Sequence, residues 1–174
     1  EQAREAAARA NAERTAARQL FLRLLTPGEG TEDVRRRVTR TEIASVDVNR
    51  NAMNRVVDRF GSSRLLSFDR DARSHQPTVE VAHEALLRSW PRLRGWVEGG
   101  REDLRMSRRL HVAAMEWIDA EREPSFLLRG GQLAQFESWA IHSSVVPTAE
   151  ERSFLDASVD ATIPSIPHWI RVSS

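Results

Sequence analysis

The residues best placed for chemistry are a histidine and a glutamate at a predicted strand-to-helix junction. In the stretch PTVEVAHEALLRSW, β-branched residues alternate up to Val81, and a helical run follows from His83 and Glu84. A helix N-terminus carries unpaired N–H groups and a partial positive charge, which suits phosphate. A histidine there can donate to a phosphate oxygen, and its charge is adjustable near neutral pH. The alternative is a packing histidine whose ring hydrogen-bonds a neighbouring carbonyl.

The sequence lacks the motifs of nucleotide hydrolysis and acyl transfer. All 26 basic residues are arginine, so the phosphate-cradling loop G-x-x-x-x-G-K-[ST] cannot be present, and no apolar run ends in a Walker-B-like aspartate. There is no G-x-S-x-G elbow and no paired His/Asp arrangement. We therefore expect no catalytic activity from this chain alone and no catalytic residues within it.

Metal chemistry is not indicated either. The chain has no cysteine, which excludes disulfides, thiolate nucleophiles and cysteine metal clusters. Its five histidines have no metal-ligand spacing. Asp69, Asp71 and Glu80 are spaced like ligands of a calcium loop, but Arg73 and Ser74 stand where that loop needs an oxygen ligand and a glycine. We expect neither a metal nor a cofactor bound by this segment itself.

Composition gives weaker indications. The 26 arginines face 25 acidic residues, and the acids are interspersed, so a pI of about 9.2 is only slight support for a nucleic-acid partner. No signal peptide or long apolar run occurs, which predicts a soluble, cytoplasmic protein without a membrane partner. Because the first residue lies inside an Ala/Arg/Glu helix and is not methionine, we expect a piece of a larger chain.

The first half of the chain predicts helices and a small hairpin. Residues 3–25 read as one helix, with an apolar stripe near its end, and 26–33 as a loop. A short edge strand at 34–40, a short helix at 41–46 capped by Thr41, and a helix at 50–60 ended by Gly61 follow. Strands at 64–68 and 77–82 flank a polar hairpin turn at 69–76. This order is that of a winged helix, with 69–76 as the wing.

The second half predicts helices only. A helix over 83–98 must kink or restart near Ser89, because Pro91 clashes with the preceding turn. Helices at 101–121 and 130–142 follow, and one at 148–159 opens with a capping box from Thr148 to Glu151. Four of the five tryptophans fall on helix faces and predict core packing, whereas Trp169 lies in the tail.

Together these patterns predict a mainly α fold containing a winged-helix sub-domain with a small β-hairpin, followed by a helical arm. The expected divisions are the leading part of the N-terminal helix, the winged-helix sub-domain, the arm and an irregular tail, at residues 1–14, 15–82, 83–160 and 161–174.

A winged helix invites a DNA-binding interpretation. The helix at 50–60 would be the recognition helix, and its arginines and asparagines could read base edges: Arg50, Asn51, Asn54 and Arg55. The arginines at 35, 36, 37 and 40 could meet phosphates. Four acids oppose this, because Asp47, Asp58, Asp69 and Asp71 flank the helix or lie in the wing and would repel a DNA backbone. A DNA-binding module of a transcriptional regulator therefore stays the alternative function.

A long ordered series of segments resembles one bacterial family. VEVAHEALLRSWPRLRGWVEGGREDLRMSRRL, AAMEWIDAEREPSFLLRGGQLAQFESWA and TAEERSFLDAS are similar to the region after the ATPase core of novel STAND NTPases, and ARQLFLRLLTPGEGTEDVRRRVTRTEI fits upstream. The resemblance covers roughly residues 15–158. These proteins are signal-transduction ATPases that often end in WD-repeat propellers.

The resemblance implies a regulatory role. In related STAND ATPases a histidine at this strand-to-helix junction contacts bound ADP, so His83 would be the sensor and Glu84 would stand where the family has aspartate. Ala82 replaces the family's methionine, which leaves the helix-start geometry in question. The implied function is nucleotide sensing and relay, with ADP or ATP bound only in the full-length protein. The implied partners are the adjacent ATPase core, a C-terminal repeat domain and, on activation, further copies of the chain.

Overall fold

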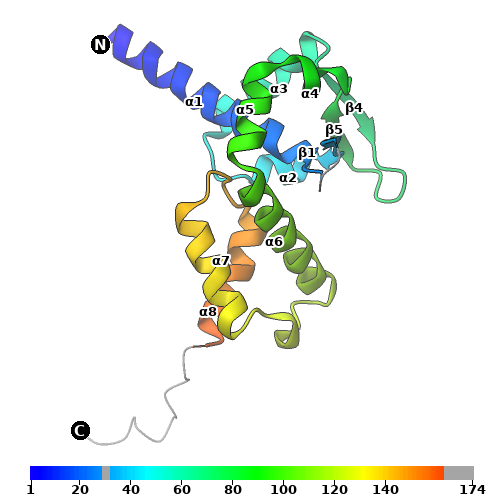
Figure 1. Cartoon of the computed structure of the whole chain (residues 1–174), viewed down its shortest axis with the longest axis vertical. Helices are drawn as coiled ribbons and strands as arrows, with labels where there is room; N and C mark the ends of the chain where they lie inside the picture. Colours follow the sequence, from blue (N-terminus) through cyan, green and yellow to red (C-terminus); the bar gives the residue numbers. More distant parts are fainter. Residues whose placement is uncertain (29–31, 163–174) are drawn as a thin grey trace, which may run out of the picture.

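The computed structural model describes residues 1–28 and 32–162, and it confirms a mainly helical fold with small antiparallel sheets (Figure 1). The described helices are α1 (Gln2–Arg23), α2 (Arg40–Ser45), α3 (Arg50–Ser62), α4 (Ala85–Ser89), α5 (Pro91–Gly99), α6 (Arg101–Asp119), α7 (Gly130–His142) and α8 (Ala149–Asp160), with a 3-10 turn at Pro124–Phe126. The strands are β1 (Leu25–Thr26), β2 (Val34–Arg35), β3 (Val38–Thr39), β4 (Leu66–Arg70) and β5 (Pro77–Val81).

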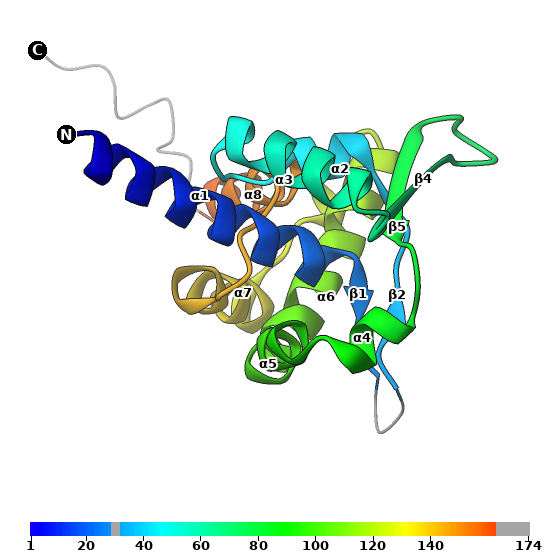
Figure 2. The same cartoon turned by 90° about the horizontal axis from the view of Figure 1, so that it is seen from above.

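Helix α1 has two unlike halves. Its first ten residues, 2–11, are all exposed, and this end of the helix projects beyond the rest of the molecule (Figures 1 and 2). Its second half is buried from Ala16 onward, because Leu20, Phe21 and Leu24 supply the apolar stripe expected from the sequence. The chain then leaves the helix at Leu24 and pairs as β1 with β2, so the predicted loop at 26–33 is in part a short strand pair.

The larger sheet has strand order β3–β5–β4, all antiparallel. Phe68 on β4 faces Val79 on β5, and Val38 on β3 faces Val79 from the other side. Asp71 closes the predicted hairpin turn, since its carboxylate accepts the backbone N–H of Ser74 at 2.7 Å and that of Arg73 at 3.0 Å. The predicted hairpin is therefore present, with the β3 strand added at one edge.

Two predictions on helix ends were wrong. Thr39, not Thr41, caps α2, since its hydroxyl accepts the N–H of Glu42 at 3.1 Å. Helix α3 also continues past Gly61 and ends at Ser62. Both differences are shifts of one or two residues at element ends, where side-chain hydrogen bonding decides the boundary.

The predicted break before Pro91 is confirmed. Trp90 has extended backbone angles (φ −100°, ψ 97°) and separates α4 from α5, where Pro91 opens the new helix. The ring of Trp90 packs edge-on against Phe21 of α1, with centroids 5.0 Å apart. The break therefore turns an aromatic side chain back into the core.

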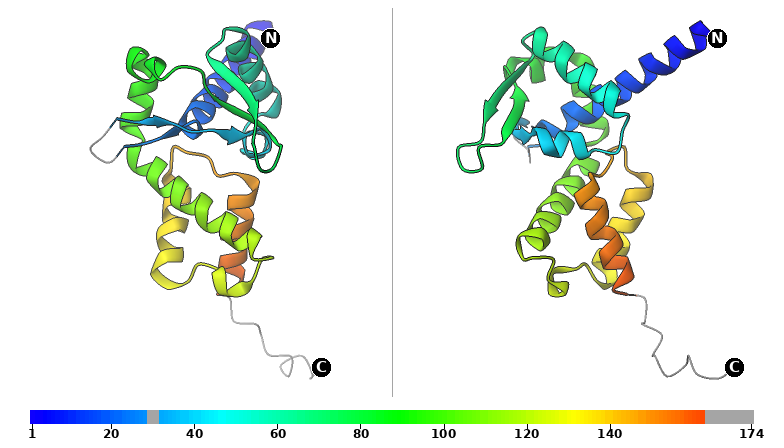
Figure 3. Two further views of the ribbon diagram at one scale, coloured as in Figure 1. Left: turned by 90° about the vertical axis from the view of Figure 1, so that its right-hand side faces the viewer. Right: turned by 180° about the vertical axis from the view of Figure 1, so that it is seen from behind.

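Two apolar cores lie one above the other (Figure 3). The first is built by α1, α3, the larger sheet, α4 and α5, and the second by α6, α7 and α8. Trp139 contacts both. Side chains of α4 and α5 belong to the first core, but a shared core does not define which segment moves as a unit, so the division expected at residues 82 and 83 stays a prediction.

Four tryptophans pack as predicted, although Trp90 lies between two helices and not on a helix face. Trp90 and Trp96 lie against the first core, Trp117 in the second, and Trp139 between them. Trp169 and most of the predicted irregular tail lie outside the described residues. In the described part of the chain, no helix is both long enough and apolar enough to cross a membrane.

Candidate functional site

His83 and Glu84 lie in the turn between β5 and α4, and both side chains are exposed. The carbonyl of His83 accepts the N–H of Leu86 at 3.0 Å, and that of Glu84 accepts the N–H of Leu87 at 2.9 Å. These bonds fix the backbone of the turn, whereas the two side chains point outward. The junction thus presents a histidine and a carboxylate at the surface, and it is not the buried packing site that was the alternative reading.

The helix behind this junction is shorter than expected. Because the chain breaks at Trp90, α4 has 5 residues. A helix of one turn aligns few peptide dipoles, so it adds little positive potential for a phosphate. The chemistry at this junction therefore rests on the His83 ring itself.

An open groove of about 490 Å³ adjoins Glu84. Its charged lining residues are Glu32, Asp33, Glu84, Arg88, Arg94, Glu98 and Arg101. Arg101 pairs with Asp33 at 2.6 Å, and Arg88 with Glu32 at 3.4 Å. Burial raises the pKa of Asp33, but the hydrogen bonds from Arg101 and the Gly28 N–H outweigh it and hold this pKa below its usual value. Two of the three arginines that line the groove are thus paired with acids.

The residues predicted to read DNA bases are exposed on α3, but one of them is paired with an acid of α1. Arg50, Asn51, Asn54 and Arg55 are all exposed on α3. Arg55 donates to Glu13 of α1 at 2.8 Å, and this acid also pairs with Arg59 at 3.4 Å. The basic face of α3 thus serves to hold α1.

The arginines expected to meet DNA phosphates are also engaged within the chain. Arg36 pairs with Glu42 at 2.7 Å and Arg37 with Glu80 at 3.3 Å. The Arg40 guanidinium lies over the Phe68 ring, 5.8 Å from its centroid. No feature of the described residues favours DNA binding.

The most elaborate polar arrangement is a buried ionic network between the two cores. Arg23 of α1 contacts both carboxylate oxygens of Glu151 on α8, at 3.3 and 3.2 Å. His111 of α6 approaches the same carboxylate through Nδ1 at 3.1 Å. Arg36 binds both oxygens of Glu42 at 2.7 and 2.9 Å and contacts His111 Nε2 at 3.2 Å. Two guanidinium groups and one imidazole thus surround two carboxylates.

The partners fix the hydrogen-bonding state of His111. Arginine can only donate, so Nε2 of His111 accepts from Arg36, and Nδ1 carries the proton that is donated to Glu151. His111 thus lies between the Arg36 guanidinium and the Glu151 carboxylate. The network is a fixed structural element and is not arranged as a general acid or base.

Glu151 is the most strongly perturbed acid of the network. Burial raises its pKa, but hydrogen bonds and charge from His111, Arg23 and the Thr148 N–H outweigh burial and lower it to about 2. Arg108 lies beside the network, and its pKa is lowered by burial first and by the charges of Arg36 and Arg23 next. The Glu151 carboxylate is therefore ionised at neutral pH.

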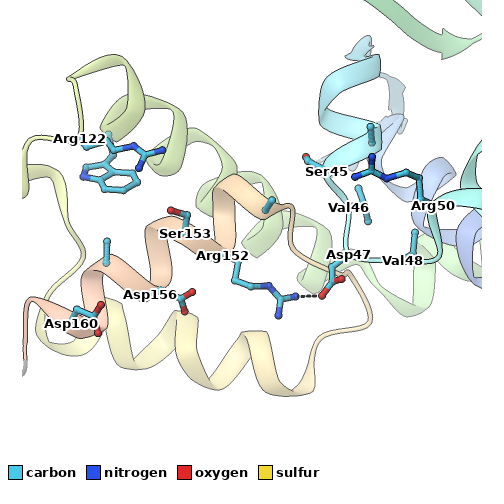
Figure 4. Close-up of a pocket in the computed structure, with 14 residues that line it drawn as sticks. Ser45, Val46, Asp47, Val48, Arg50, Arg122, Arg152, Ser153, Asp156 and Asp160 are labelled. Atoms are coloured by element: carbon cyan, nitrogen blue, oxygen red, sulfur yellow. Dashed lines mark ion pairs between the residues drawn. The ribbon is translucent and has the colours of Figure 1, made fainter.

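A second open groove, of about 820 Å³, runs along the junction of the cores (Figure 4). One wall is formed by the segment between α2 and α3, and the other by α8 with Trp117 and Arg122. Arg152 crosses the groove to Asp47 at 2.8 Å, as the dashed line in Figure 4 marks. Acids and arginines alternate along it, which gives no consistent charge preference for a ligand.

The ionic network was not predicted from the sequence. Its signal was Arg23, a charge within the apolar run LFLRLL, where every neighbour is buried. The capping box predicted for Glu151 is confirmed, with Thr148 N–H donating to its carboxylate at 2.8 Å. The capping role of Glu151 could be predicted, but its burial against Arg23 depends on residues more than a hundred positions apart.

Comparison with known proteins assigns the chain to a family. Residues 1–125, most of the chain, match the family model Novel STAND NTPase 1. The chain therefore belongs to this family of STAND NTPases, and the resemblance expected from the sequence is confirmed at that level. Residues 126–158 of the resemblance lie beyond the match. No curated protein and no solved structure matched the chain.

Proposed function

We propose that this chain is the regulatory nucleotide-sensing and relay segment of a STAND-type signalling ATPase. The ATPase core that binds and hydrolyses the nucleotide lies elsewhere in the same protein, since the chain contains no lysine for a phosphate-cradling loop. The ATPase core and a C-terminal repeat domain are the proposed partners, and several copies assemble on activation. ADP or ATP is the ligand, bound by the core and contacted by this segment.

The sensing part of this proposal is a winged helix. Helices α1, α2 and α3 precede the β4–β5 hairpin, and β3 completes a sheet of order β3–β5–β4. The turn at 69–76 is the wing. This arrangement supports a packing module that places the end of β5 against a neighbouring domain.

The observation that carries the proposal is the exposed His83–Glu84 pair at the end of β5 in a member of the STAND family. An imidazole fixed by a hydrogen-bonded turn can donate to a phosphate oxygen that another domain presents. Since two of the three arginines in the adjoining groove pair with acids, we infer that the phosphate comes with the partner domain.

The test is the affinity of the intact protein for ADP after His83→Ala. A lost hydrogen bond to a charged phosphate is worth roughly 1.5–3 kcal/mol, so the affinity should fall by about ten- to a hundredfold. Basal signalling should rise, because ADP holds such ATPases at rest. Isothermal titration calorimetry gives the affinity, and a reporter of the downstream response gives the signal.

His75→Ala is the matched control, since His75 is an exposed histidine at the tip of the hairpin. We expect it to leave the ADP affinity unchanged. Equal ADP affinities for wild type and His83→Ala would refute the assignment of His83 as the sensor.

A further inference from the structure

The described chain crosses between its two cores once, at a pair of glycines. We call residues 1–99 the N-terminal unit and residues 101–160 the C-terminal unit. Gly99 ends α5, and Gly100 links it to α6 (Figure 3). No neighbouring atom lies within 4 Å of the place where a Cβ on Gly99 would stand. Because glycine backbones are the least restricted, this joint is the place where the connection between the two units can bend.

Away from this joint, α1 holds the loop between α7 and α8 with two buried side chains. Gln19 donates to the Ser144 carbonyl at 2.8 Å and accepts the Val146 N–H at 2.9 Å. Arg23 donates to the Val146 carbonyl at 2.5 Å and pairs with Glu151. Gln19 and Arg23 are four positions apart and so lie on one face of α1. They supply partners for backbone groups of the loop that need hydrogen bonds when buried.

The polar contact between the units determines their relative orientation more than it adds free energy of association. A buried ion pair loses hydration that offsets much of its attraction, so it specifies an arrangement better than it stabilises one. Two apolar side chains of the C-terminal unit enter the first core, Leu104 close to the joint and Val145 in the loop. The exposed Asp47–Arg152 pair adds little, because solvent screens it. The Arg101–Asp33 pair at 2.6 Å, the Arg36–His111 contact at 3.2 Å and the backbone bridge of Val46 with Thr148 also join the units.

We propose that Gln19 and Arg23 form a latch that controls a hinge movement about Gly99–Gly100. When the latch opens, the C-terminal unit swings away from the N-terminal unit and Val145 leaves the first core, while the helices of each unit keep their packing against one another. The first half of α1, at the start of the N-terminal unit, projects beyond the other elements (Figure 2). A domain that moves this half of the helix therefore acts directly on the latch in its second half. The proposal concerns the two units alone and does not depend on the role of His83.

The absence of cysteine allows a direct distance measurement in the 174-residue chain. Spin labels are placed at Asn54→Cys on α3 and Gln135→Cys on α7, which are both exposed, and the distance distribution is measured by double electron–electron resonance. Gln19→Leu removes two hydrogen bonds across the junction without leaving a charge unpaired. We expect a second, longer distance whose population rises about tenfold, with unchanged helix content by circular dichroism.

The control is Glu13→Gln, which removes an ion pair of α1 inside the N-terminal unit and should leave the distance distribution as in wild type. Arg23→Gln is the second latch variant and should also populate the longer distance. A single unchanged distance in the latch variants that fold would overturn the proposal.

If neither latch variant folds, hydrogen exchange of the unaltered chain decides. The Val146 amide donates its hydrogen bond to the Gln19 side chain. This amide should exchange faster than the Val57 amide in the centre of α3. If both amides are equally protected from exchange and both exchange only by global unfolding, the hinge is contradicted.

Discussion

At the scale of residues, Glu151 is the acid on which the buried network depends. It is fully buried, and its pKa is lowered from 4.5 to about 2 despite burial. A carboxylate whose pKa is lower in the folded state stabilises the fold above its unfolded pKa and loses that contribution as the pH falls through the folded value. For Glu151 the loss occurs between about pH 4.5 and pH 2. The contribution at neutral pH is on the order of 3 kcal/mol.

Glu151→Gln should therefore destabilise the chain at pH 7 and flatten the acid side of its stability profile. Glutamine can still serve in the capping box, so the start of α8 keeps its cap. The loss at pH 7 should be about 3 kcal/mol, since Arg23 is left without its buried partner. Urea unfolding at several pH values measures both effects, with Glu150→Gln as a control of equal charge change. Parallel pH profiles for wild type and Glu151→Gln would contradict this account of the network.

Some residue roles followed from local patterns, and others could not. The cap at Thr148 was predictable because its partner Glu151 is three positions along the same helix. The contact of Arg23 with Glu151 was not, because sequence spacing says nothing about which helix faces which. His83 was selected by its place after β5, and its exposure became visible only in three dimensions.

At the scale of elements, the start of α2 offers a direct check of the corrected cap. Thr39→Ala removes the hydroxyl that accepts the Glu42 N–H and should cost about 1 kcal/mol of unfolding free energy. Thr41→Ala should cost far less, because Thr41 is exposed and lies inside the helix. Thr39→Ser should keep most of the stability. Chemical denaturation of the three variants distinguishes them, and a larger loss for Thr41→Ala would show the cap to be misassigned.

Helix positions were predictable where periodicity and breakers agreed. The helix expected at 130–142 is α7 with the same bounds, since a glycine pair opens it and apolar residues recur along one face. The segment from 34 to 40 was harder, because its arginines have partners far away in sequence, and it forms parts of two different sheets. Tertiary pairing, which sequence periodicity does not encode, decided that segment.

At the scale of the whole molecule, the chain should not turn over ATP by itself. Without lysine it cannot form the loop that cradles the nucleotide phosphates. Phosphate release by the purified 174-residue chain should match that of buffer. Turnover abolished by a single substitution within these residues would place catalysis here and overturn the regulatory role.

The two-core arrangement offers a physical path for the proposed relay. The exposed junction at His83 belongs to the N-terminal unit, and that unit holds the C-terminal unit through α1. The order of helices and strands could be predicted from the sequence, but the stacking of two cores across a polar contact could not, because it depends on Gln19 and Arg23 meeting a loop far along the chain.

The most direct test of nucleotide sensing is hydrogen exchange of the intact protein with and without ADP. If His83 contacts the nucleotide, ADP should slow exchange of the Leu86 and Leu87 amides, because holding the ring also holds the turn whose carbonyls they bond. The Ser74 amide in the hairpin turn should be unaffected, and the ADP effect should vanish in His83→Ala. Unchanged exchange at Leu86 and Leu87 in the presence of bound ADP would contradict the proposed function.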